Sequence, residues 1–313
     1  MRLGKLFQLG IVWLACTVNA DNLLDAHYQF NSYNAYSPNV MKDGAIYRMW
    51  YGGWQASSDY PNDKIYYRYS SDNISWSTVQ TVLTPGQVST SAQHVNDPSV
   101  TKHFNVTSGT YQYTMFYTVC VSPCNQSDNQ IWSSVSSDGV TWAFPQMLAI
   151  GGPAEPSAIY DPSSDGTYWK VYYVDRNALD KVRMLKVNGN RNAIISQDVY
   201  SNSNFAMANP EVQYFNGSWQ LFFNVWKQSP LRMDIYKVTS GNNTSWPANT
   251  STGIILNTTN PGGICMTATP GILPDPSISN RYHMYFAVQF APSGGYCTSP
   301  ISFVETDRWY MSN

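Results

Sequence analysis

A short motif centred on a proline occurs five times along this chain at nearly constant spacing. The five copies are Ser37-Pro38-Asn39-Val40, Asp97-Pro98-Ser99-Val100, Glu155-Pro156-Ser157-Ala158, Asn209-Pro210-Glu211-Val212 and Thr269-Pro270-Gly271-Ile272. Successive copies are 60, 58, 54 and 60 residues apart. A fixed period indicates a repeat architecture, in which each repeat is one supersecondary unit packed against its neighbours.

Each motif is followed by a segment rich in aromatic and β-branched residues, which favours a half-buried strand. These segments are 46–54, 111–119, 168–176, 219–227 and 282–290. They account for much of an aromatic content of 15%, in a chain of which only 12% is charged, about half the usual share. That composition excludes an intrinsically disordered chain.

The repeat predicts an all-β fold, a five-bladed β-propeller with four antiparallel strands per blade. A β-sandwich also has short strands, but it does not predict such a period. We expect one propeller domain over residues 21–313, with blades starting near residues 37, 97, 155, 209 and 269. The turns at 70–76 and 136–142 resemble the Asp-box of sialidases but are one residue shorter, so we interpret them as tight hairpins closed by a Trp.

The first twenty residues have the pattern of a signal peptide. Arg2 and Lys5 precede an apolar run from residue 6 to 18, and the sequence then ends in a small-residue cleavage site at Ala20. The run is too short to span a membrane, so we expect a secreted protein, extracellular or periplasmic. A lipid anchor on Cys16 is the alternative.

Four cysteines remain after such cleavage, and an even number in an exported chain favours disulfides. They are Cys120, Cys124, Cys265 and Cys297. We expect Cys120 to pair with Cys124 and Cys265 with Cys297. A zinc site is the alternative, but no C-x-x-C pair or nearby His supports it.

In a propeller, the first strand of each blade lines the central axis, so the residues before the five prolines should surround one mouth of the axis. They are Ser37, Asp97, Glu155, Asn209 and Thr269. Because side chains alternate along a strand, a second polar ring should lie one step deeper. Its members are Asn39, Ser99, Ser157, Glu211 and Gly271. Loops on the same face should add side chains from each blade, among them Trp54, Asp59, Asp175, Arg176 and Trp226.

A polar funnel with carboxylates and tryptophans is suited to sugars, because aromatic faces stack on sugar rings and polar groups bind hydroxyls. Glycoside hydrolysis needs a carboxylic acid and a second carboxylate. Asp97 and Glu155 lie on adjacent blades, which is compatible with the roughly 6.5–9.5 Å separation of an inverting pair.

The chain resembles the five-bladed propeller glycosidases of families 43, 32, 62 and 130, the arabinanase, xylosidase and invertase group. The resemblance lies in the architecture, in HVNDPSV at 94–100, and in the blade start Glu155-Pro156. It implies Glu155 as general acid and Asp97 as the residue that tunes or orients it, and from the residues themselves Asp97 as base is a further possibility. The family's catalytic base has no counterpart, because Ser37 or Thr269 stands at its position. Substitutes would be Glu211, Asp175 or Asp59.

We expect a carbohydrate ligand, contacted by Trp54, Trp226, His94 and Arg176 together with Asn209 and Ser37. Asp97 could instead only accept backbone N–H bonds, and His94 could be structural. The net charge of −2 predicts no nucleic-acid partner. We expect a monomer without a cofactor, although a calcium ion on the axis stays open. Two other functions remain, a non-catalytic carbohydrate-binding propeller and a protein-interaction scaffold.

Overall fold

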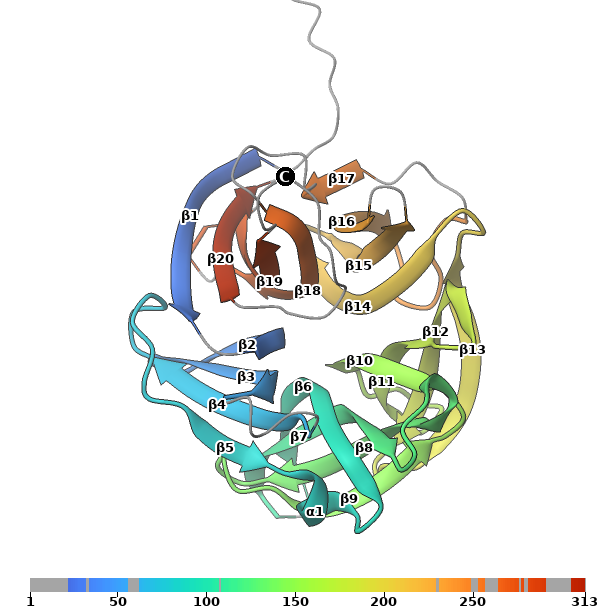
Figure 1. The fold of residues 1–313 in the computed structure, drawn as a ribbon. Coiled ribbons are helices and arrows are strands. Elements are labelled where there is room, and N and C mark those ends of the chain that lie inside the picture. Colours follow the sequence, from blue (N-terminus) through green and yellow to red (C-terminus); the bar gives the residue numbers. More distant parts are fainter. Residues whose placement is uncertain are drawn as a thin grey trace, which may run out of the picture.

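The computed structural model has five blades arranged around a central axis (Figure 1). It describes residues 22–31, 34–55, 62–106, 108–228, 231–248, 253–256, 264–275, 277–278, 281–290 and 305–312. Each blade contains four antiparallel strands. The fold class predicted from the repeat is therefore confirmed.

Blades 1 to 3 are separate sheets formed in chain order. Blade 1 comprises β2 (Asn34–Asp43), β3 (Ile46–Trp54), β4 (Lys64–Ser70) and β5 (Gln80–Leu83). Blade 2 comprises β6 (Ala92–Asn105), β7 (Thr110–Val121), β8 (Asn129–Ser136) and β9 (Ala143–Ala149). Blade 3 comprises β10 (Pro153–Tyr160), β11 (Thr167–Asp175), β12 (Ala178–Asn188) and β13 (Ala193–Ser201). A helical turn, α1 (Pro85–Val88), follows β5, and a 3₁₀ turn, η2 (Gln126–Asp128), precedes β8.

Blades 4 and 5 are joined by one parallel bridge between Met233 and Met266. Blade 4 comprises β14 (Ala206–Phe215), β15 (Ser218–Gln228), β16 (Leu231–Ser240) and β17 (Gly253–Leu256). Blade 5 comprises β18 (Ile264–Pro274), β19 (Arg281–Phe290), β20 (Glu305–Ser312) and β1 (Asn22–Asn31). The N-terminal strand β1 is thus the outermost strand of the last blade, where it pairs with β20 (Figure 1).

The aromatic second strands form the core between blades. Trp50 on β3 packs in one apolar cluster with Met115 and Tyr117 on β7 of the next blade. Tyr172 on β11 packs in the same way with Phe223 on β15. These rings are fully buried, and their hydrophobic surface holds neighbouring blades together.

All five residues that precede the motif prolines have a left-handed backbone. Their φ angles are 50° for Ser37, 51° for Asp97, 60° for Glu155, 48° for Asn209 and 55° for Thr269. At each of these positions the pairing of the first and second strands also shifts by a β-bulge. Proline has no N–H to contribute to the ladder, so a bulge is the natural place for it. The bulge turns the preceding side chain toward the axis, in a strained conformation that costs about 1–3 kcal/mol for a residue other than glycine.

A series of hydrogen bonds around the axis joins the first strands of neighbouring blades. The backbone N–H of Val100 donates to Asn39 Oδ1 at 3.0 Å, and that of Ala158 donates to Ser99 Oγ at 2.9 Å. The N–H of Val212 likewise donates to Ser157 Oγ at 3.0 Å. The second polar ring predicted from the motif is therefore largely used to join blades.

The turn between the third and fourth strands of blades 1, 2 and 4 reaches into the preceding blade. We call these turns, residues 70–76, 136–142 and 240–246, the outer turns. In the first, Asp72 Oδ1 accepts the N–H groups of Ile74 and Ser75 at 2.8 and 2.7 Å. Asp138 and Asn242 make the equivalent bonds in the other two. The outer turns are therefore tight hairpins that each end in a Trp. The sequence predicts the first two of them, and the third was not predicted.

Cys120 and Cys124 form the expected disulfide, in a turn that contains the cis peptide bond Ser122–Pro123. The predicted signal peptide, Asp59, Cys297 and the side chain of Cys265 lie outside the described residues. No helix in the described part of the chain is long and apolar enough to cross a membrane.

Candidate active site

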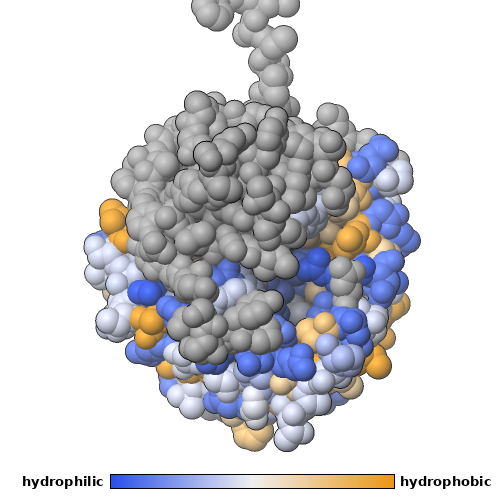
Figure 2. All heavy atoms as spheres, viewed as in Figure 1, coloured by the Kyte–Doolittle hydropathy of each residue, from blue (hydrophilic) through white to orange (hydrophobic). Residues whose placement is uncertain are grey.

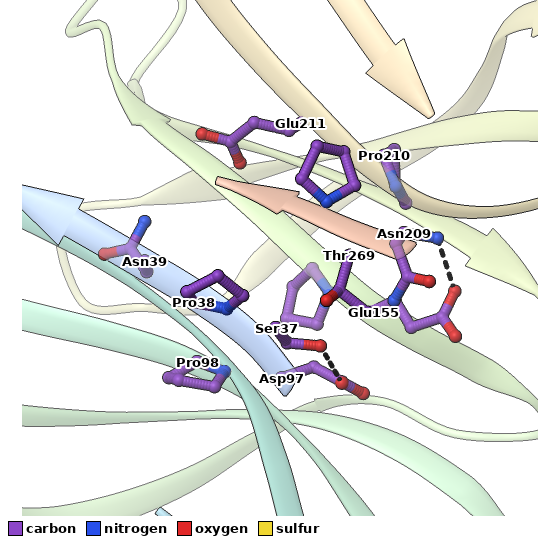
Figure 3. A pocket seen from close by; sticks show the side chains of 12 residues that line it. Ser37, Pro38, Asn39, Asp97, Pro98, Glu155, Asn209, Pro210, Glu211 and Thr269 are labelled. Atoms are coloured by element: carbon purple, nitrogen blue, oxygen red, sulfur yellow. Dashed lines mark hydrogen bonds between the residues drawn. The ribbon is translucent and has the colours of Figure 1, made fainter. Parts of the chain in front are cut away.

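Motif residues of four blades, neighbouring strand residues and two loops surround a cavity of about 220 Å³. Among the described residues its lining is Asn34, Tyr36, Trp54, Asp63, Asn96, Asp97, Glu155, Arg176, Asn209, Trp226, Met233 and Thr269. A narrower funnel adjoins it and is lined by the motif residues of all five blades, ten of which are labelled in Figure 3. In the face shown in Figure 2, hydrophilic side chains lie near the middle and also along the right edge. The cavity is smaller than the roughly 300–1,000 Å³ of drug-sized ligand sites, which suits a single sugar ring.

Glu155 is a buried carboxylate with both oxygens occupied. Its Oε1 forms an ion pair with the Arg176 guanidinium, and its Oε2 accepts the backbone N–H of Asn209 at 2.7 Å (Figure 3). Its own N–H donates to Thr118 Oγ1 at 2.8 Å. An adjacent guanidinium stabilises the ionised form of a carboxyl group. These contacts hold the Glu155 carboxylate in a fixed position.

Asp97 is the carboxyl group whose environment favours the protonated form. Only 7% of it is exposed, and Ser37 Oγ donates to its Oδ1 at 2.6 Å (Figure 3). Burial, followed by the negative charge of Glu155, raises the pKa of Asp97 to about 7, although Ser37 opposes this shift. Two carboxyl groups whose surroundings differ in this way are typical of an acid and its charged partner. The expected role of Glu155 as general acid stays a prediction, and Asp97 is a second candidate for it.

Glu211 lies in the funnel and is also buried. Its Oε2 accepts from Ser157 Oγ and its Oε1 from Gln213 Nε2, both at 2.9 Å. Burial raises the pKa of Glu211 to about 7, because these hydrogen bonds only partly offset desolvation. Glu211 lines the funnel but not the larger cavity, so its contacts favour a role in the axis over a direct role on a ligand.

The predicted sugar-binding residues are partly brought together. Trp54, Trp226, Arg176 and Asn209 line the cavity, while Ser37 lines the adjoining funnel. His94 lies behind the wall, with Nδ1 3.2 Å from Asp63 Oδ2.

The structure does not place Asp175, a predicted substitute for the base, in the cavity lining. Its Oδ2 pairs with Arg183 Nη1 at 3.2 Å, and its Oδ1 accepts the N–H of Asn177 at 2.9 Å. These contacts turn its carboxylate toward its own blade. In the described residues Asp175 therefore has structural partners and no contact with the other predicted catalytic groups.

Five residues of the cavity lining were not predicted from the sequence: Asn34, Tyr36, Asp63, Asn96 and Met233. Tyr36 and Asn96 directly precede motif residues, so their position beside the motif was a usable signal. Asp63 lies in the β3–β4 loop and carries no such signal. Its Oδ2 accepts from Tyr36 OH at 2.6 Å and from Asn96 Nδ2 at 3.4 Å.

Several polar atoms around this cavity are buried without a hydrogen-bond partner in the described structure. They are Asp63 Oδ1, Asn96 Oδ1 and Thr269 Oγ1. A buried polar atom without a partner costs about 1–3 kcal/mol, and such atoms are rare in native proteins. A ligand with several hydroxyl groups could satisfy all three, since a hydroxyl both donates and accepts.

The axis offers a poor set of ligands for the calcium ion considered above. Calcium binds six to eight oxygens, usually with several carboxylates. In the described part of the chain no three His, Cys, Asp or Glu side chains are grouped to hold a metal ion. The funnel carboxylates Glu155 and Glu211 are instead bonded to protein donors.

Comparison with solved structures shows the same fold in glycoside hydrolases of low sequence identity. The GH43 endo-arabinanase from Bacillus licheniformis is 13% identical with a TM-score of 0.65, covering 90% of this chain and 96% of that one. The catalytic domain of the GH62 α-L-arabinofuranosidase from Coprinopsis cinerea is 10% identical with a TM-score of 0.64, covering 92% and 97%. The GH43 protein BlXynB from B. licheniformis is 14% identical with a TM-score of 0.64; the match covers 91% of this chain but 54% of that protein.

No protein-family model matches the sequence, and no curated protein is significantly similar to it. The structural likeness extends over nearly the whole chain, at 10–14% identity. It establishes the propeller fold shared with families 43 and 62. The function is inferred from the residues that line the cavity.

Proposed function

We propose that this protein is an exported glycoside hydrolase that acts on a neutral poly- or oligosaccharide. The observation that carries the proposal is Asp97, a buried carboxyl group with a pKa raised to about 7, in a cavity walled by Trp54 and Trp226. A carboxylic acid that keeps its proton near neutral pH can protonate the leaving oxygen of a glycoside.

The charges of the cavity support a neutral sugar. Arg176 is ion-paired with Glu155, so its charge is already compensated. Asp63 and Asp97 add carboxyl groups to the same lining. An anionic sugar would therefore meet repulsion, whereas a neutral ring can stack on the tryptophans and bind the unpartnered polar atoms.

Export is proposed from the signal-peptide pattern of residues 1–20. The Cys120–Cys124 disulfide supports it, because such bonds persist in oxidising compartments.

A panel of aryl glycosides and oligosaccharides tests the hydrolase. Asp97→Asn should lower kcat/KM by about 10²–10⁴-fold on natural oligosaccharides. The same variant should lose much less on aryl glycosides with a strongly acidic phenol, since such leaving groups need little protonation. An equal loss on both substrate classes would contradict Asp97 as the proton donor.

A non-catalytic carbohydrate-binding propeller is the second candidate. It is favoured by the full set of protein partners on Glu155 and by Ser37, which has no carboxylate. Binding of a sugar that Trp226→Ala abolishes, with no turnover of any substrate, would establish it in place of the hydrolase.

A further inference from the structure

Asp63 is a third carboxyl group in the cavity and comes from a loop of blade 1. It directly precedes β4, and its side chain lines the cavity together with Asp97 and Trp54. Only 6% of Asp63 is exposed. A carboxylate this deeply buried needs an explanation, because its desolvation is unfavourable unless its oxygens are bonded.

One oxygen of Asp63 is firmly held. Tyr36 OH donates to Oδ2 at 2.6 Å, and Asn96 Nδ2 supports both groups, at 3.1 Å from the Tyr36 oxygen and 3.4 Å from Oδ2. Burial and the negative charges of Asp63 and Asp97 raise the pKa of Tyr36 well above its usual value near 10. Tyr36 therefore keeps its proton and remains a donor to Asp63, within the electrostatic influence of both carboxyl groups.

The other oxygen, Asp63 Oδ1, is buried and has no hydrogen-bond partner among the described residues. Two other carboxylates of the described chain, Glu155 and Asp43, differ in that respect. Glu155 uses both oxygens, and Asp43 binds Arg48 through Oδ2 and Lys102 through Oδ1. Asp63 is thus oriented through one oxygen, while the other is left for a group that the protein does not supply.

Resting on the proposed function, we propose that Asp63 is the general base of the hydrolysis. Its carboxylate takes a proton from a water molecule while the water oxygen bonds to the anomeric carbon. The bond from that carbon to the leaving oxygen breaks, and Asp97 gives its proton to that oxygen. The products are an alcohol and a sugar of inverted configuration, with one proton moved from Asp97 to Asp63 through the reaction. Exchange with solvent restores both groups. Blade 1, which has Ser37 at its motif position, would thereby supply its carboxylate from a loop.

The test is Asp63→Asn, which keeps the shape of the side chain and an oxygen for Tyr36. We expect kcat to fall by at least about 100-fold, with KM within a few-fold of wild type. In Asp63→Ala, added azide should restore turnover and give a glycosyl azide of inverted configuration, since azide needs no base. Asp180→Asn, which removes a charge outside the cavity lining, is the matched control and should keep wild-type kcat.

Three results would overturn the proposal while leaving the hydrolase intact. The first is an unchanged kcat in Asp63→Asn when Asp97→Asn is inactive. The second is a rise in the KM of Asp63→Asn with no fall in its kcat. The third is retention of the anomeric configuration in the products of the wild-type protein, measured by NMR. If wild type turns over no glycoside at all, the proposed function fails, and the base falls with it. Thermal unfolding of each variant separates loss of catalysis from loss of fold.

Discussion

Three buried carboxyl groups near the axis lie in different electrostatic surroundings. Asp97, Glu155 and Glu211 are each at most 7% exposed, and within the described part of the chain only Glu155 forms an ion pair. Burial raises the pKa of both Asp97 and Glu211, whereas Glu155 is held by its ion pair with Arg176. The effect of these surroundings on the stability of the protein can be measured without any substrate.

Glu211 should make the protein less stable as pH rises. In the unfolded chain its carboxyl group ionises near 4.5, but in the folded protein it holds its proton to about pH 7. Between these values the folded state binds more protons, so the free energy of unfolding falls as pH increases. This destabilisation is absent below pH 4.5 and reaches its full size, on the order of 3 kcal/mol, above about pH 7.

Urea unfolding of wild type and Glu211→Gln between pH 4 and 8 measures this effect. The stability of the variant relative to wild type should increase across the window, because Gln carries no charge at either end. Asp97 titrates in both proteins and cancels in the difference. Parallel pH profiles would contradict a raised pKa at Glu211.

Arg176→Met should destabilise the fold by leaving Glu155 buried without its partner. Breaking a buried ion pair costs about 3–5 kcal/mol, and we expect roughly 2–3 kcal/mol here because Arg176 is partly exposed. Glu155→Gln added to Arg176→Met should recover most of the loss, since the uncompensated charge is then removed. Denaturant unfolding of wild type, both single variants and the double variant forms a double-mutant cycle that measures the coupling of this pair. Additive losses would show that the pair is not coupled.

At the scale of elements, the outer turns join each blade to the preceding one through a single inserted residue. Asn73 Oδ1 accepts from Tyr285 OH of blade 5 at 2.5 Å. The Gly139 carbonyl accepts from Trp50 Nε1 of blade 1 at 2.8 Å. Asn243 Oδ1 accepts from Lys170 Nζ of blade 3, and its Nδ2 donates to Asp161, both at 2.8 Å.

Asn73→Ala and Asn243→Ala should each lower the free energy of unfolding by about 2–3 kcal/mol, because buried partners lose their hydrogen bonds. Asn73 carries an additional cost, since its φ of 62° is unfavourable for alanine. Asn204→Ala, at an exposed turn position, is the control and should change stability by less than about 0.5 kcal/mol. Equal effects at all three positions would contradict the role of the inserted residue.

The sequence allows the elements to be predicted but not their finer geometry. The aromatic segment 46–54 coincides with β3 because periodicity and propensity act locally along the chain. The bulge and positive φ at each motif arise from ladder pairing with the second strand, which no local pattern specifies. Asp63 was missed for the same reason, because its position depends on contacts with β2 and β6. Asp175 was expected in the funnel, but Arg183 on the neighbouring strand binds it instead.

At the scale of the molecule, stability depends on closing the ring between blades 5 and 1. The strand β1 closes blade 5 on the outside by pairing with β20, which covers an edge that would otherwise expose unpaired backbone groups. Near the axis, the first strands of the same two blades meet at Gly271 and Pro38. A Cβ on Gly271 would lie 1.9 Å from the Pro38 carbonyl oxygen.

Gly271→Ala should therefore destabilise the whole propeller. The other blades use a side chain at this motif position, as Asn39 does toward Val100, but at the closing contact the backbones approach too closely for one. The clash is with backbone, so relief requires moving blade 5 away from blade 1. We expect a loss of about 3 kcal/mol, the upper end of the usual range for overpacking. Gly241→Ala is the matched control, because a Cβ there meets no atom within 4 Å. Thermal and urea unfolding of both variants measure the difference, and increased proteolysis at β1 or β20 in Gly271→Ala would locate the opening at this contact. Equal stability of the two variants would show that ring closure tolerates a wider spacing between blades 5 and 1.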